Sequence, residues 1–85
     1  MSKKDKLLKR LKLKPKDFTY DELRTLLNYL GFVENNKGKT SGSAVKYINN
    51  IYNKEILLHK PHPSNVLKQY QIKLVIDTLR KIGVI

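Results

Sequence analysis

The stretch whose residue types best suit chemistry runs from Gly38 to Tyr47 and reads Gly-Lys-Thr-Ser-Gly-Ser-Ala-Val-Lys-Tyr. Its glycines and hydroxyl residues favour a loop whose backbone N–H groups can approach a phosphate. Gly38-Lys39-Thr40 imitates the end of a nucleotide-binding P-loop, but that motif needs a glycine where Val33 stands. We therefore exclude nucleotide hydrolysis. Two interpretations stay open, a phosphate-contacting loop or a hairpin connection without a ligand.

The two histidines, His59 and His62, lie on a predicted strand and on the extended segment after it. Side chains alternate along an extended chain, so residues three apart face opposite ways, which argues against a metal site made of both. Either imidazole alone could act as a general base or acid near neutral pH. For His62, which stands between two prolines, the alternative is a hydrogen-bonding loop residue. The carboxylates are scattered, so the clustered acids of a metal nuclease are not expected.

Positive charge is the strongest feature of the composition. Eighteen lysines and arginines against seven acidic residues give a net charge of +11. Such an excess on a small chain predicts a polyanionic partner: nucleic acid first, an acidic protein second and an anionic membrane third. Most of the excess lies in residues 1–16, so we expect a basic N-terminal arm over residues 1–17 that adds affinity. A mildly basic domain over residues 18–85 would then hold any chemistry.

Length and residue usage narrow the class further. A chain of 85 residues builds one modest core, with no room for a bulky cofactor. The absence of cysteine excludes disulfides and cysteine-ligated zinc. No apolar run has the length of a transmembrane span or the continuity of a signal peptide. We expect a cytoplasmic protein with no cofactor, no metal and no membrane partner.

Two helices are predicted before the loop. The first begins near Ser2 and ends before Pro15, and its leucines recur at helical spacing beneath a polar face of lysine and arginine. We expect it to dock on the core through these leucines and to contact RNA, and the alternative is a half-ordered segment. In the second, over residues 18–32, Thr19 and Glu22 form a capping box and Gly31 fits the left-handed position after the last turn. Its apolar stripe is Tyr20, Leu23, Leu26, Leu27 and Leu30.

Three short strands and a last helix follow, which predicts an α+β fold. The strands are expected at Phe32 to Glu34, Ala44 to Ile48 and Glu55 to Lys60, and tight turns favour an antiparallel three-stranded sheet. Within the second strand, alternation places Val45 and Tyr47 on one face and Ala44, Lys46 and Ile48 on the other. Within the third strand, it places Ile56 and Leu58 on one face and Leu57 and His59 on the other. The last helix is expected from about Leu67 to Gly83, with Tyr70, Leu74, Val75, Leu79 and Ile82 near one face. Helices would cover one face of the sheet and leave the other partly open.

Four segments, taken in order, resemble the HicA toxins. They are Leu30-Gly31-Phe32, Gly38 to Tyr47, Leu58 to Pro63 and Tyr70 to Ile85. The resemblance covers about residues 19–85 and leaves the basic arm outside. It implies a fold similar to double-stranded-RNA-binding domains, a metal-independent endoribonuclease that cleaves messenger RNA, and a HicB antitoxin as partner.

One residue departs from the family pattern. The residue after Gly-Ser is usually the catalytic histidine in this family, and here it is Ala44. Alanine can neither take the proton of a ribose 2′-OH nor stabilise a phosphorane, so activity would need another group. His59 or His62 could supply an imidazole, and Lys46 could stabilise the developing charge.

Three functions therefore stay open: a HicA-like toxin, active through a relocated base or disarmed at Ala44; a non-catalytic RNA-binding module; and a protein-binding regulator. Single-stranded or messenger RNA is expected to contact Lys39, Ser41, Gly42, Ser43, Lys46 and Lys60. Tyr47, Tyr52 and Tyr70 could stack on bases, although Tyr47 could instead belong to the core.

Overall fold

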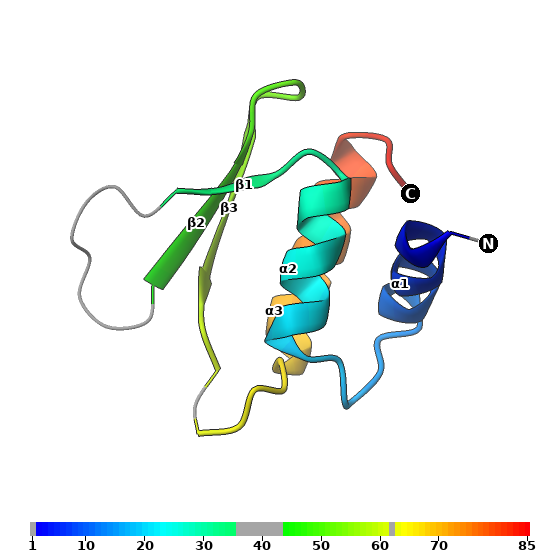
Figure 1. The fold of residues 1–85 in the computed structure, drawn as a ribbon, viewed down its shortest axis with the longest axis vertical. Helices are drawn as coiled ribbons and strands as arrows, with labels where there is room; N and C mark the ends of the chain where they lie inside the picture. Colours follow the sequence, from blue (N-terminus) through cyan, green and yellow to red (C-terminus); the bar gives the residue numbers. More distant parts are fainter. Residues whose placement is uncertain (1, 36–43, 62) are drawn as a thin grey trace.

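The structure, a computed structural model, describes residues 2–35, 44–61 and 63–85. Its elements in chain order are α1 (Lys3–Lys12), α2 (Tyr20–Tyr29), β1 (Val33–Asn35), β2 (Ala44–Asn49), β3 (Lys54–His59) and α3 (Gln69–Lys81). Figure 1 shows the predicted α+β arrangement, with the sheet on one side and the helices on the other. The fold class is confirmed, and the likeness to double-stranded-RNA-binding domains stays a prediction.

The three strands form an antiparallel sheet in the order β1-β2-β3, as the short turns predict. Helices α2 and α3 lie against one face of this sheet, and no described element covers the other face (Figure 1). Buried and exposed side chains alternate along β2 and β3 as predicted. The register pairs Val45 with Leu58 and Tyr47 with Ile56, all four of which face the helices.

The start and the end of α2 follow the local sequence. Glu22 Oε1 accepts from the Thr19 backbone N–H at 2.9 Å, and the Glu22 N–H donates to Thr19 Oγ1 at 3.2 Å. At the other end, Gly31 has φ +94°, and the Phe32 N–H donates to the Leu27 carbonyl at 2.8 Å. Both the predicted capping box and the predicted glycine stop are confirmed.

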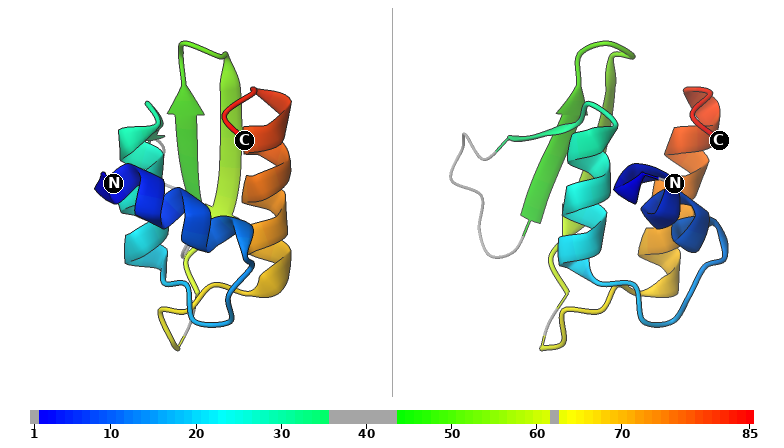
Figure 2. Two further views of the ribbon diagram at one scale, coloured as in Figure 1. Left: turned by 90° about the vertical axis from the view of Figure 1, so that its right-hand side faces the viewer. Right: turned by 45° about the vertical axis from the view of Figure 1, so that its right-hand side comes forward.

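Helix α1 is packed on the rest of the molecule. Leu7 and Leu11 are buried in the same core as the leucines of α2 and the strand residues, which confirms the predicted docking. Figure 2 shows α1 lying across α2 and α3 on their side away from the sheet. The layers are therefore sheet, helix pair and α1, and the uncovered face of the sheet and the outer side of α1 lie at opposite ends of this stack.

The predicted face of α3 needs correction. Val75 and Leu79 are buried as expected, but Tyr70 is 63% exposed and Leu74 is 42% exposed. Ile72 and Ile76 take their places in the core. The neighbouring Gln71 is also buried, and its side chain donates a hydrogen bond to the His59 carbonyl of β3. This contact is consistent with a rotation of α3 in which Ile72 and Ile76, and not Tyr70 and Leu74, face the sheet.

A buried asparagine joins the sheet to α2. Asn49 ends β2, and its Nδ2 donates to the Leu30 carbonyl at the end of α2 at 3.1 Å. Its Oδ1 accepts from the N–H groups of Ile51 and Tyr52, at 2.9 and 3.1 Å, which closes the turn between β2 and β3. One side chain therefore sets both the hairpin turn and its place against the helix.

Candidate functional site

The uncovered side of the sheet brings together several of the residues expected to carry chemistry. Its members, called the open face below, are Val33 and Asn35 of β1, Ala44, Lys46 and Ile48 of β2, and Glu55, Leu57 and His59 of β3. Apolar side chains are unusually exposed there, since Val33 keeps 62% and Leu57 keeps 59% of its surface in contact with solvent. A protein surface that shows both apolar side chains and a positive charge is suited to a partner that has apolar surface and negative charge.

Ala44 and His59 stand directly opposite each other on neighbouring strands. Their Cα atoms are partners in the β2–β3 register, so both side chains project from the open face. Directly paired residues of an antiparallel sheet have Cβ atoms about 4.5–5.5 Å apart. The alanine side chain is a single methyl group, and the imidazole of His59 opposite it is exposed. His59 is thus placed next to Ala44.

The backbone at His59 is held by a residue that the sequence analysis missed. Gln71 of α3 is buried, and its Nε2 donates to the His59 carbonyl at 2.8 Å. Its Oε1 accepts from the Lys68 N–H at 2.9 Å, so the same amide also closes the start of α3. The one signal in the sequence was a glutamine at the third position of a helix, where a side chain can reach back to the preceding backbone.

The two lysines predicted beside the site lie on different sides of the sheet. Lys46 is exposed on the open face, two residues along β2 from Ala44, and its Nζ lies 4.0 Å from Glu55 Oε1. Lys60 follows His59, and its Nζ lies 5.8 Å from the centre of the Tyr20 ring, which belongs to α2. Lys46 therefore shares the open face with Ala44 and His59, whereas Lys60 contacts the helical side.

The remaining predicted site residues lie outside the described part of the chain. They are Lys39, Ser41, Gly42, Ser43 and His62. Their expected contacts with RNA, and the expected acid–base role of His62, stay predictions.

A buried tyrosine pair supports β2 from behind the open face. The hydroxyl groups of Tyr20 and Tyr47 lie 2.6 Å apart in the core. Burial raises the pKa of both phenols above its ordinary value, because the charged form would lose its hydration. Tyr47 is therefore a core residue and cannot stack on a base, whereas Tyr52 and Tyr70 are exposed. The neutral pair fixes β2 against α2 one residue from Lys46.

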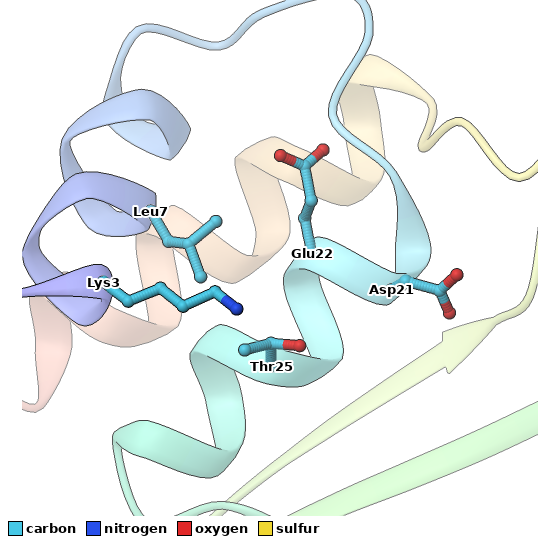
Figure 3. Close-up of a pocket in the computed structure, with 5 residues that line it drawn as sticks. All are labelled: Lys3, Leu7, Asp21, Glu22 and Thr25. Atoms are coloured by element: carbon cyan, nitrogen blue, oxygen red, sulfur yellow. The ribbon is translucent and has the colours of Figure 1, made fainter.

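A second concave surface lies between α1 and α2 and is drawn in Figure 3. Lys3 extends along it towards Thr25, and Leu7 lines it from the α1 side. The carboxylate of Glu22 points away from Lys3 in this view, and it is already engaged by Thr19 and by Arg10. The other carboxylate of the lining, Asp21, accepts from Asn65 Nδ2 at 3.2 Å. This groove is remote from the open face, and both of its carboxylates are occupied by contacts within the fold.

The described residues also bear on metal binding and on membrane insertion. Over residues 2–35, 44–61 and 63–85, no three histidine, cysteine or acidic side chains gather in a group that could hold a metal ion. In the same residues, no helix combines the length and the apolar character needed to cross a membrane. The expected independence from metals and membranes stays a prediction.

Comparison with known proteins gives one match. The family model for the HicA toxin of bacterial toxin–antitoxin systems matches residues 20–84, from the first residue of α2 to the segment after α3. No curated protein and no solved structure matches the chain significantly. The match spans most of the sequence and all three strands, and it leaves α1 outside. The chain is therefore a member of the HicA toxin family.

Proposed function

We propose that this chain is a toxin that cleaves RNA without a metal ion, and that His59 supplies the imidazole expected at Ala44. The observation that carries the proposal is the register of β2 and β3, in which these two residues are direct partners on the open face. An imidazole moved from Ala44 to His59 shifts by one strand spacing, about 4.8 Å, and stays on the same surface. A bound phosphate can adjust to such a shift more easily than to a change of face.

The chemistry follows from the groups on this face. The imidazole of His59 takes the proton of a ribose 2′-OH, and the 2′-oxygen attacks the adjacent phosphorus. The bond from phosphorus to the 5′-oxygen breaks, that oxygen takes a proton from water, and a cyclic 2′,3′-phosphate remains. The protonated imidazole of His59 then returns its proton to the solvent. The Lys46 ammonium, a diagonal neighbour of His59 in the sheet, stabilises the extra negative charge of the phosphorane.

Single-stranded RNA is the substrate that this surface suits best. Its bases are unpaired and can lie on exposed apolar side chains such as Val33 and Leu57, while its phosphates meet Lys46. The loop that enters β2 at Ala44 would add backbone contacts to phosphate, as its glycines and hydroxyl residues predict. Messenger RNA in the cytoplasm is the natural form of such a substrate.

An antitoxin of the HicB type is the proposed protein partner. A toxin encoded with its inhibitor needs a face that the inhibitor can cover, and covering the open face would hide His59 and Lys46 together. The net charge of +11 favours a partner with an acidic surface. The antitoxin and the RNA would then compete for one surface, which an RNA-cleavage assay with added antitoxin would detect.

The deciding experiment compares cleavage of a long single-stranded RNA, in EDTA, by the chain itself, His59→Gln and His62→Ala. Loss of a general base costs roughly 10²–10⁴ in rate, so His59→Gln should be slower by that factor. His62→Ala, which removes the other imidazole, should keep most of the activity.

Three results would overturn or redirect the proposal. Normal cleavage by His59→Gln would show that the base lies elsewhere. A large loss in His62→Ala alone would transfer the role to that residue. If the unmodified chain binds the RNA but never cuts it, a non-catalytic RNA-binding module is the better description.

A further inference from the structure

The outer side of α1 is a second concentration of positive charge that the sheet chemistry does not use. Lys6, Lys9 and Lys12 are spaced three apart, which places them on one side of the helix, and all three are exposed. We call this surface the α1 lysine face. It lies opposite Leu7 and Leu11, which are buried against α2 and α3. The lysines therefore project into solvent from the layer farthest from the sheet.

These lysines are not needed to hold α1 in place. Among the ion pairs of the described residues, the basic residue of α1 that takes part is Arg10, at 2.7 Å from Asp17 and 3.4 Å from Glu22. Arg10 also lies 5.3 Å from the centre of the Phe18 ring, so it connects α1 to the start of α2. The helix dipole favours cations in the last turn, which does not account for a lysine as early as Lys6. The fold explains Arg10 and leaves the lysine face without a structural role.

The surroundings of the lysine face indicate which polyanion it fits. A membrane-binding helix needs its apolar side free to enter the lipid, and the leucines of α1 are in the core. A protein interface needs apolar or aromatic residues at its centre, and the outer side of α1 offers one, Leu13. A surface with dense charge and almost no apolar area matches the phosphate backbone of a nucleic acid.

We propose that the α1 lysine face binds the phosphate backbone of RNA as a second site, separate from the open face of the sheet. The two surfaces are at opposite ends of the layered stack, and the mid-planes of their two layers are about 20 Å apart at ordinary layer spacings of about 10 Å. A strand that touches both must pass around the helix pair, a path of about 30 Å or more. At 3.4 Å per stacked nucleotide this takes about ten nucleotides. Longer RNAs gain affinity from both surfaces, and shorter ones reach one at a time.

The test measures binding of a fluorescent single-stranded 30-nucleotide RNA between 50 and 200 mM salt, in a His59→Gln background so that no strand is cut. The variant carries Lys6→Gln, Lys9→Gln and Lys12→Gln. Each phosphate contact contributes about 0.7 to the slope of log affinity against log salt for single strands, so the slope should fall by about 2. A matched control removes the same charge elsewhere, with Lys54→Gln, Lys73→Gln and Lys81→Gln, and should change the slope much less. Thermal melting should show that both variants fold.

The outcomes separate this proposal from its rivals. An equal fall of slope in the control would show that net charge alone matters, and no change in the lysine-face variant would show that RNA does not bind there. Either result overturns the second site. Anionic vesicles serve as a further probe, and a variant that loses vesicle binding while keeping RNA binding would assign the face to a membrane. All of these readouts are binding measurements, so they do not depend on whether His59 is the catalytic base.

Discussion

The open face of the sheet and the α1 lysine face carry positive charge in different ways. On the open face, Lys46 lies 4.0 Å from a carboxylate of Glu55, and the nearby His59 has its backbone held by a buried amide. On the α1 lysine face, the side chains are exposed and none belongs to an ion pair of the described residues. The open face has one lysine, which lies beside a carboxylate, and the α1 lysine face has three lysines outside the ion pairs of the described residues.

This difference suits the two surfaces to different tasks, proton transfer on the open face and attraction of a polyanion on the α1 lysine face. Proton transfer requires one group within hydrogen-bond distance of a particular atom, so its efficiency depends on position. Attraction of a polyanion depends on how many charges are near, and flexible lysines supply it without fixed geometry. A small domain can therefore place chemistry on a paired strand and affinity on a surface helix. Four substitution experiments test this division.

The largest effect is expected from moving the imidazole across the strand pair. His59→Ala should reduce cleavage of single-stranded RNA by roughly 10²–10⁴, and adding Ala44→His to that variant should restore most of it. The reason is that the two positions are direct partners on one face. A histidine at Lys54, the other end of β3, serves as the control. Recovery by Lys54→His as well would mean that the position of the imidazole does not matter.

The next effect concerns whether α1 is a fixed part of the domain. Leu11 is fully buried, so Leu11→Ala should lower the free energy of unfolding by about 2–5 kcal/mol. Leu13 is 75% exposed, and the same substitution there should change it by less than about 0.5 kcal/mol. Urea denaturation followed by circular dichroism measures both. Equal, small effects would mean that α1 is a loose arm, and the lysine face would then have no defined place.

A smaller effect tests whether the position of His59 depends on its support. Gln71→Leu leaves the His59 carbonyl without its donor, which should cost about 1–3 kcal/mol of unfolding free energy. At temperatures where the variant is folded, kcat should fall while KM changes little, because the imidazole is misplaced but the RNA contacts remain. The control is Gln69→Leu, which removes an exposed hydrogen bond to Pro15. A variant of Gln71 with normal kcat would show that its role is structural only.

The smallest effect is expected on stability at alkaline pH, from Tyr47 on the buried face of β2. Burial raises the pKa of Tyr47, so the folded protein keeps this phenol neutral while the unfolded chain ionises near pH 10. The contribution of such a group to stability is complete below pH 10 and is lost as the pH rises further, by about 1.4 kcal/mol per pH unit.

Alkaline denaturation measures this loss. Tyr47→Phe should make stability fall less steeply above pH 10, and Tyr52→Phe, at an exposed tyrosine, should leave the slope unchanged. The same slope in all three proteins would contradict a buried, neutral phenol behind the open face.

Much of the fold could be predicted because its signals are local. The capping box at Thr19, the left-handed Gly31 and the alternation along β2 each depend on a few neighbouring residues, and the structure confirms all three. The rotation of α3 could not be predicted, because its apolar residues cover a wide arc. Contacts with the sheet, including the one from Gln71, select which side is buried.

The element types, the alternation of faces along each strand and the positive charge follow from the amino-acid sequence, because propensity, period and composition need no knowledge of distant contacts. Tertiary structure alone decided that His59 stands beside Ala44 and that α1 lies at the far side of the helix pair. A slip of one residue in the β2–β3 register would have put Lys60 in the place of His59. The register is fixed where Asn49 closes the turn and holds it to Leu30, a contact between residues far apart in the chain.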